Sequence, residues 1–448
     1  MKTTLLLMSL ALAVPSFAVP TASVTALSQD ASTKLVTVSY TVSEAAIVTP
    51  EFFLGGSPLA GERWLDRLNG TINQEVSAGK THSFTWAPDA VAGGLDLSGK
   101  ALKVKLTAWS PLQPPPYAAL DLTVTNGVRY YASSNAVPGG VHDHRYRSDI
   151  VLMRRIPAKN VVWTMGMSTE AVAWDSWAGP AQTRVKLTYD YYMAIFPMTV
   201  RQHEHLALND RKMGGFNRTA SVDDGYAAYM GRPALCMSWN SLRGTSKGAN
   251  WPAADSDLDE AHAVDADSIV GKARAVTGKP VDLATEAEWE YACRAGTWTD
   301  TYNGKTIMTQ AERTATSAHG RICRYTGNSN YNSSGKATKD FPAAGPLPDQ
   351  GGTATVGSYE PNAWGIYDML GQTREWVLDW YAPRSTDLVT VVENPRGPKS
   401  STDTSPSRVY KGGCYYDGAY ICCSGARGKV TPSTGTWPTG YRFCWIIK

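Results

Sequence analysis

Long helical periodicity is scarce in the C-terminal part of this chain, and this scarcity limits the folds that it can adopt. The clearest helix starts at Thr285, whose hydroxyl is placed to cap the first turn, and Glu288 three residues later completes a capping box. Gly296 provides the stop. Most other segments from 128 to 448 are loops rich in Gly, Asn, Ser and Pro. We therefore expect few long helices in this part of the chain.

The first 18 residues have the features of an export signal. Lys2 precedes an apolar run over 5–14, and Ser16 and Ala18 give a small-x-small ending. This run is too short to span a bilayer, and no later segment is long enough either. We expect cleavage near Ala18 and a secreted or periplasmic protein without a membrane span.

The segment 19–127 is predicted to form a separate all-β module. Three stretches, 35–42, 82–86 and 102–109, alternate apolar and polar side chains as half-buried strands do. Turn residues separate these stretches at the spacing of a small sandwich. We expect an immunoglobulin-like or fibronectin-like module, with an irregular N-terminal extension as the alternative. The second domain then covers 128–448.

Composition narrows the class of partner. The formal net charge is +3 and 19% of residues are charged. Neither sign of charge dominates strongly, so the composition does not indicate a nucleic-acid partner. The chain has 15 Trp and 22 Tyr against only 8 Phe, and rings with a polar tip suit a loop-rich, partly wet core. The sequence contains no phosphate-binding loop, dinucleotide fingerprint or Gly-x-Ser-x-Gly motif.

Several strings, in order, are similar to those of one family. The matching strings are Thr164-Met165-Gly166, Val185-Lys186-Leu187-Thr188, Tyr192 to Val200, Thr285 to Ala292, Val356-Gly357-Ser358, Pro361 to Trp376, Arg408 to Gly413 and Gly440-Tyr441-Arg442. Together they resemble the formylglycine-generating-enzyme, or sulfatase-modifying-factor, family over about 150–448. The resemblance implies a C-type-lectin-like α+β fold with little regular secondary structure, and it gives Trp376, Arg427 and Arg442 pocket or structural roles.

The resemblance also locates the chemistry. Active members of that family hold copper with two cysteines five residues apart and oxidise a sulfatase cysteine to formylglycine. Counting from Gly413 places the first cysteine position on Asp417 and the second on Cys422. A carboxylate is a poor substitute for a thiolate toward Cu(I). We expect a non-catalytic binding or scaffold member for a peptide, glycan or secreted protein. The alternative is a copper-dependent formylglycine-generating oxidase, with Cys414 as an improvised second thiol.

The chain has an odd number of cysteines, so at least one is unpaired. In an oxidising compartment disulfides form readily, although spacing alone does not fix their connectivity. The resemblance implies a disulfide between Cys293 and Cys422, with Cys423 as the alternative partner of Cys293. The seven cysteines are Cys236, Cys293, Cys323, Cys414, Cys422, Cys423 and Cys444, and Cys444 is left with Cys236 or Cys323 as candidate partners.

A calcium site is the second feature that the resemblance implies. Family members bind the ion through a loop that matches Gln372, Thr373 and Glu375 here, although Gln372 replaces the usual Asn. Oxygen ligands of this kind suit calcium. A second calcium loop would use Asn328 or Asn330. In the other interpretation, the carboxylate pairs with an arginine.

The sequence contains two His-x-His pairs. His203 and His205 form one pair, and His142 and His144 form the other. Residues two apart on a helix point to different sides, so the first pair is poorly arranged for a shared metal. We expect both pairs to lie on the solvated surface.

Overall fold

The computed structural model describes most of the chain in two compact units. The units comprise 1–60 with 67–114, and 61–66 with 115–448. The sequence placed the division after 127. The predicted export signal, 1–18, lies outside the described residues, among which no helix has the length and apolarity to cross a bilayer. The described residues are 19–59, 67–88, 97, 99–167, 181–207, 230–252, 263–305, 319–329, 352–384, 386–402, 404–435 and 438–447.

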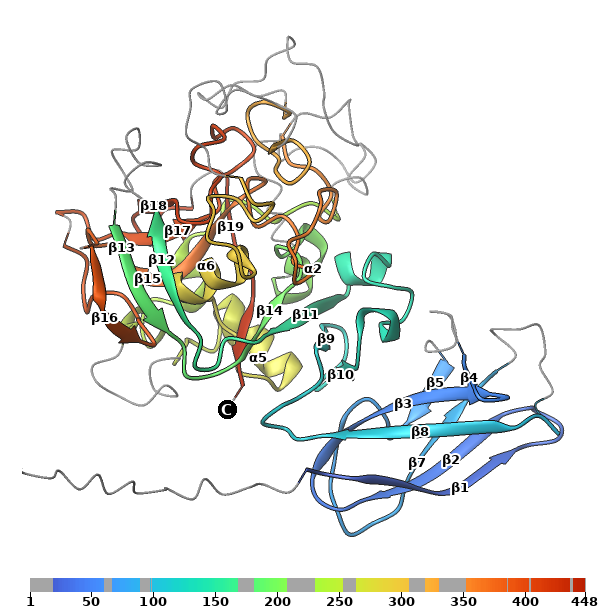
Figure 1. Cartoon of the computed structure of the whole chain (residues 1–448). Coiled ribbons are helices and arrows are strands. Elements are labelled where there is room, and N and C mark those ends of the chain that lie inside the picture. Colours follow the sequence, from blue (N-terminus) through green and yellow to red (C-terminus); the bar gives the residue numbers. More distant parts are fainter. Residues whose placement is uncertain are drawn as a thin grey trace, which may run out of the picture. The chain divides into compact units, whose positions relative to one another are not determined.

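The described part of the first unit consists of strands in two sheets (Figure 1). One sheet has the order β1-β2-β7-β5; in the other, β3 pairs with β4, β6 and β8, and all pairings are antiparallel. Every second residue of β2 is buried, as the alternation predicted. The immunoglobulin-like or fibronectin-like type remains a prediction. The strands are β1 Ala22–Gln29, β2 Val36–Val42, β3 Ala46–Leu54, β4 Ser57–Pro58, β5 Leu68–Gly70, β6 Glu75–Val76, β7 His82–Trp86 and β8 Leu102–Trp109.

The second unit mixes three small sheets with short helices and long loops, which matches the expected α+β class. The sheets have the orders β10-β9-β11-β14-β20, β12-β13-β16 and β18-β17-β15-β19. Strand β20 pairs with β14 and forms one edge of the first of these sheets. The strands are β9 Tyr117–Asp121, β10 Val128–Tyr131, β11 Ile150–Ile156, β12 Val162–Met167, β13 Ala181–Lys186, β14 Tyr191–Ala194, β15 Arg374–Trp380, β16 Asp387–Glu393, β17 Arg408–Lys411, β18 Arg427–Val430, β19 Thr439–Gly440 and β20 Cys444–Ile446.

The helix α6 lies among the strands of this unit and contacts β12, β15 and β17 (Figure 1). The predicted capping box is present, since Thr285 Oγ1 accepts from Glu288 N at 3.2 Å and Glu288 Oε2 accepts from Thr285 N at 2.7 Å. All nine helical residues are buried, so α6 is a central core element. The helices are α2 Val200–Leu206, α3 Trp239–Arg243, α5 Ile269–Thr277 and α6 Glu286–Arg294, with 3-10 turns η2 Ser134–Ala136, η3 His144–Arg147 and η5 Gly248–Asn250.

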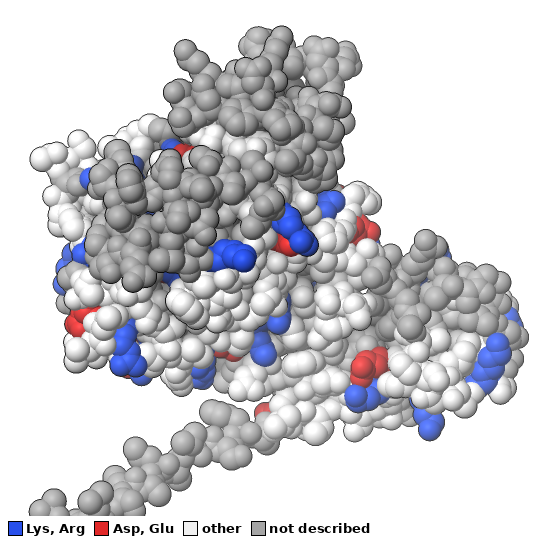
Figure 2. All heavy atoms as spheres, turned by 45° about the horizontal axis from the view of Figure 1, so that its top comes forward, with Lys and Arg blue, Asp and Glu red and all other residues white. Residues whose placement is uncertain are grey.

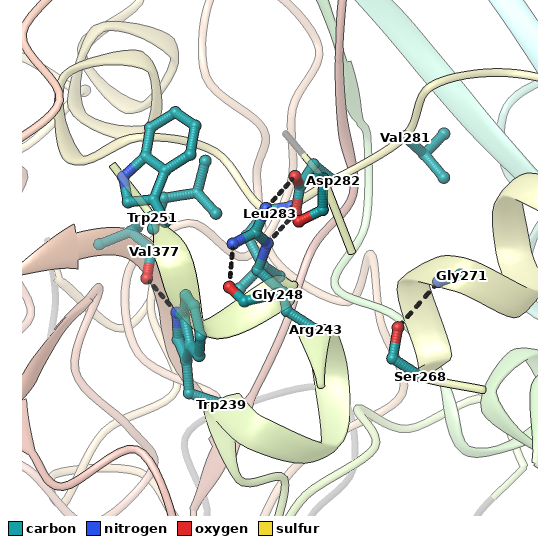
Figure 3. A network of polar contacts seen from close by, with 12 residues as sticks. Trp239, Arg243, Gly248, Trp251, Ser268, Gly271, Val281, Asp282, Leu283 and Val377 are labelled. Atoms are coloured by element: carbon teal, nitrogen blue, oxygen red, sulfur yellow. Dashed lines mark hydrogen bonds and ion pairs between the residues drawn. The ribbon is translucent and has the colours of Figure 1, made fainter. Parts of the chain in front are cut away.

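A buried ion pair supports the core beside α3 (Figure 3). Arg243 Nε and Nη2 donate to the two carboxylate oxygens of Asp282 at 2.9 and 3.0 Å. Arg243 Nη1 also donates to Gly248 O at 2.7 Å, while Trp239 Nε1 donates to Val377 O at 3.0 Å. Because every polar atom named here has a partner, these burials are compensated.

Candidate functional site

The position expected for the first copper-binding thiol is occupied by a salt bridge. Arg374, on β15, donates through Nε to Asp417 Oδ2 at 2.9 Å and through Nη2 to Asp417 Oδ1 at 2.6 Å. Cys414 N donates to Asp417 Oδ2 at 3.0 Å. The guanidinium also lies over the rings of Tyr410 and Tyr416, at 5.0 and 5.4 Å. Both carboxylate oxygens are therefore engaged, and Asp417 fixes the turn that follows Gly413.

The second thiol position, Cys422, is fully buried. Its thiol donates to Cys414 O at 3.8 Å. Burial raises the pKa of the Cys422, Cys414 and Cys323 thiols above the ordinary value. Metal binding and nucleophilic attack both need the thiolate. These neutral, enclosed thiols are therefore poorly prepared for either.

Cys323 is fully buried on the residues 319–329, which contact the turn that follows Gly413, and the sequence did not predict this contact. The sequence offered Cys323 as a candidate partner for Cys444, and the Cys444 thiol donates to Glu288 Oε2 at 3.9 Å. The contact between the two loops includes the hydrogen bond from Thr326 N to Asp417 O at 3.1 Å. Sequence spacing carries no signal for such a meeting of two loops.

The disulfide expected between Cys293 and Cys422 stays a prediction. The structure holds all seven cysteines as thiols. Cys293 Sγ, at the end of α6, donates to Ser424 Oγ at 3.4 Å. Cys422 and Cys423 lie in a turn instead of a strand, with Cys423 Sγ directed at Ala419 O at 3.5 Å.

The oxygens of the implied calcium loop are used by the protein itself. Gln372 Oε1 accepts from Ala354 N at 2.9 Å, and Thr373 Oγ1 donates to a backbone carbonyl at 2.7 Å. Asn328 Oδ1 accepts from Tyr325 N at 2.9 Å. Asn330 lies outside the described residues. Within the described ranges no group of three His, Cys, Asp or Glu side chains is placed to hold a metal, and the calcium site stays a prediction.

Glu375, the remaining calcium candidate, pairs with an arginine. Arg442 Nη2 donates to Glu375 Oε1 at 2.7 Å, and Trp289 Nε1 donates to Glu375 Oε2 at 2.7 Å. These contacts join β15 to α6 and to the C-terminal segment. Trp376 Nε1 donates to Met237 O at 2.8 Å. The pocket or structural roles implied for Trp376 and Arg442 stay a prediction.

Arg427 belongs to a second cluster of buried charges beside a cavity. Its Nε lies 2.9 Å from Glu286 Oε1, and Arg384 Nη2 lies 2.6 Å from the same oxygen. The cavity has a volume of about 780 Å³ and is lined by these three residues together with Asp379 and Trp380. Burial and then the nearby Glu286 carboxylate raise the pKa of Asp379 to about 7.

On the face of the molecule that Figure 2 shows, acidic and basic side chains are scattered and neither kind forms a large patch.

The histidine pairs divide between buried and exposed positions. His203 is fully buried, with Nδ1 3.1 Å from Tyr441 Oη, so the solvated-surface expectation was wrong for it. A helix begins at Val200 and turns this side chain toward the core. His144 is largely exposed, as expected. His142 contacts the Tyr367 hydroxyl at 3.0 Å.

A family model and several known proteins are similar to parts of this chain. The sulfatase-modifying factor enzyme 1-like domain matches residues 153–447. The formylglycine-generating enzyme of Bos taurus is 31% identical over 167 residues, which are 36% of this chain and 37% of that enzyme. The enzyme of Thermomonospora curvata is 28% identical over 184 residues, or 38% of this chain and 58% of that one. The chain thus matches less than two thirds of the length of either relative.

Among solved structures, Treponema denticola variable protein 1 has a TM-score of 0.42 and 20% identity, covering 66% of this chain and 95% of its own. PvdO from Pseudomonas aeruginosa has a TM-score of 0.42 and 19% identity, covering 66% and 94%. The domain match covers more than half of the sequence and coincides with the predicted range of about 150–448. The chain therefore belongs to the sulfatase-modifying factor enzyme 1-like family.

Proposed function

We propose that this chain is a non-catalytic member of its family, exported to bind or scaffold a peptide, glycan or secreted protein. The observation that carries the proposal is the salt bridge between Asp417 and Arg374 at the position of the first copper-binding thiol. An ion pair with both oxygens engaged leaves no ligand for a soft metal at this position.

The copper that the family implies does not fit the remaining residues. Asp417 is bound by Arg374, and the thiols of Cys414 and Cys422 are fully buried. Cys323 is fully buried as well. An oxidase of this type must bring a substrate cysteine to its sulfurs, and enclosed thiols offer no such approach.

The cavity beside Arg427 supports a binding role. Asp379 and Trp380 line it, together with the ion-paired Glu286 and Arg384. Polar groups of fixed orientation beside an aromatic wall are typical of small-ligand and peptide sites. Asp379 Oδ2 accepts the Glu286 N–H at 2.7 Å, which fixes the orientation of its carboxyl group.

The test compares the natural chain with Asp417→Cys, using Asp417→Ser as the matched control for loss of the salt bridge. Cu(I) affinity is measured by competition with a chromogenic chelator, and turnover by the thiol-to-aldehyde mass change of a Cys-x-Pro-x-Arg peptide. We expect no turnover by the natural chain and about tenfold tighter Cu(I) binding by Asp417→Cys than by Asp417→Ser, because a second thiolate is supplied. Turnover by the natural chain that disappears in Cys422→Ala would overturn the proposal.

A further inference from the structure

The cavity beside Arg427 is lined by more basic than acidic side chains. Its volume of about 780 Å³ lies within the range of small-ligand sites, roughly 300–1,000 Å³. Glu393, one of the acidic residues, pairs with Lys186, which lies outside the lining. The lining therefore carries a surplus of positive charge. Its charged residues are Arg384, Arg396, Lys399 and Arg427 against Glu286, Asp379 and Glu393.

Two guanidinium groups in this lining share the carboxylate of Glu286. Arg427 Nη2 donates to Glu286 Oε2 at 2.9 Å, and Arg427 Nη1 donates to Ala382 O at 2.8 Å. Arg384 Nη2 lies 2.6 Å from Glu286 Oε1, yet it has no hydrogen bond of good geometry among the described residues. Arg427 is therefore well satisfied, and Arg384 is held less completely.

The second carboxylate near Arg384 is already engaged by other cations. Arg384 Nη2 is 3.8 Å from Glu290 Oε2, whereas Lys411 and Arg294 approach Glu290 to 3.1 and 2.8 Å. The Nε and Nη1 donors of Arg384 make neither of its two ion-pair contacts, with Glu286 and Glu290. Its side chain is only 14% exposed, so water offsets little of this charge. Such a guanidinium is suited to bind an oxyanion of a ligand.

Asp379 repels an anion in this cavity less than an ordinary aspartate would. Burial and then the Glu286 carboxylate raise the pKa of Asp379 to about 7. At neutral pH this carboxyl group is therefore uncharged in about half of the molecules. The uncharged form is a hydrogen-bond donor, which an oxyanion can accept.

The rest of the lining is mainly apolar. Met165 of β12, Val185 of β13 and Val392 of β16 contribute to it, with Trp380 at the end of β15. The lining also contains the prolines Pro252, Pro383, Pro395 and Pro398. A guanidinium among apolar walls fits a carboxylate carried beside an apolar side chain, as in a peptide. A sugar chain fits less well, because its many hydroxyl groups need polar partners.

We propose that this cavity binds an acidic peptide, in which an Asp or Glu carboxylate pairs with Arg384 and a neighbouring apolar side chain contacts the walls. The inference names a ligand class for the proposed binding role and rests on that role. A peptide with an amide in place of the carboxylate would leave the buried charge of Arg384 poorly compensated. The cavity should therefore distinguish Glu from Gln.

Isothermal titration calorimetry of the full chain at pH 7 with two matched peptides tests this. Acetyl-Leu-Glu-Leu-amide carries the carboxylate, and acetyl-Leu-Gln-Leu-amide has nearly the same shape without the charge. We expect the natural chain to bind the Glu peptide about tenfold more tightly than the Gln peptide, and Arg384→Gln to reduce this ratio to about twofold. The matched control Arg321→Gln removes an exposed arginine that pairs with Glu360, and it should leave the ratio unchanged.

Three results of this titration would overturn the inference. They are binding of neither peptide by the natural chain, equal affinities for the two peptides, and a ratio that Arg384→Gln leaves unchanged. A sulfated disaccharide is titrated beside the peptides. If it bound more tightly than the Glu peptide, the assignment to a peptide would be wrong.

Val392→Trp covers the case in which Arg384→Gln folds poorly, because it changes no charged residue. Val392 lies on the edge strand β16 and is 37% exposed, so a larger ring can be accommodated there while it narrows the cavity. Binding of the Glu peptide should weaken about tenfold or more in this variant. Unchanged binding would mean that the peptide lies elsewhere, which also overturns the inference.

The outcomes separate this inference from the proposed function. Absent or equal binding of the two peptides, without turnover of the Cys-x-Pro-x-Arg peptide, removes only the ligand class. Turnover that depends on Cys422 removes the proposed function.

Discussion

Two buried arginine–aspartate pairs show how the candidate site differs from the supporting core. Arg243–Asp282 and Arg374–Asp417 are both joined by two hydrogen bonds, of 2.9 and 3.0 Å and of 2.9 and 2.6 Å. The Arg243 side chain is 0% exposed and that of Arg374 is 19% exposed. The position where the family resemblance implies a thiol is thus built like a structural ion pair, but closer to solvent.

This difference in exposure predicts how much stability is lost when each pair is broken by mutation. A buried ion pair is costly to break because the remaining charge loses its partner, and the cost falls when water reaches the site. The core pair has further support, since Arg274 Nη2 lies 3.2 Å from Asp282 Oδ2. The site pair instead connects β15 to the turn after Gly413.

The largest effect is expected at the core pair. Arg243→Met should lower the free energy of unfolding by about 3–5 kcal/mol, because Asp282 loses two hydrogen bonds in a buried position. The measurement is urea unfolding at neutral pH. In the Arg243→Met/Asp282→Asn double variant the loss should be smaller than the sum of the single losses. A loss below about 1 kcal/mol for Arg243→Met would show that the core pair is no stronger than a surface pair.

The site pair should be weaker. Arg374→Met is expected to cost about 1.5–3 kcal/mol, since the guanidinium is partly exposed and its interaction with Asp417 is therefore partly screened by water. Urea unfolding with Asp417→Asn as the second arm of a double-mutant cycle measures the coupling. If Arg374→Met cost more than Arg243→Met, exposure would not be what separates the two regions.

Local structure in these regions was predictable from sequence. The capping pair Thr285 and Glu288 located α6, and alternation located β2, because both patterns act over a few residues. The missing thiol at Asp417 followed from the family resemblance and residue counting.

The partners of these residues were not predictable. Asp417 pairs with Arg374 of β15, and the residues 319–329 meet the turn after Gly413 through tertiary backbone hydrogen bonds such as Thr326 N to Asp417 O. A periodicity reports which face of an element is buried, and it contains nothing about which loops come together. His203 illustrates the same limit, because its burial depends on where α2 packs.

A buried carboxyl without a close guanidinium hydrogen bond sharpens the comparison. The pKa of Asp379 is raised to about 7, first by burial and then by the Glu286 carboxylate. Between its ordinary value and 7 the folded state holds a proton that the unfolded state releases, so this group's contribution to stability falls as pH rises. From pH 5 to 7 the loss should be about 2 kcal/mol relative to Asp379→Asn, which has no such titration. Unfolding free energies of both proteins at pH 5, 6, 7 and 8 test this, and parallel pH profiles would contradict it.

The smallest effect is expected for a hydrogen bond whose donor is a thiol and not a charged group. Ser424→Ala removes the acceptor of the Cys293 thiol and should cost about 0.5–1 kcal/mol, because S–H is a weak donor and Ser424 is buried. A double-mutant cycle with Cys293→Ala, measured by urea unfolding, should give a coupling of about 0.5 kcal/mol. If Cys293 were instead joined to Cys422, its sulfur would have no proton to donate. The coupling would then be absent in the oxidised protein and appear only after reduction, which is the result expected from the pairing that the family resemblance implies.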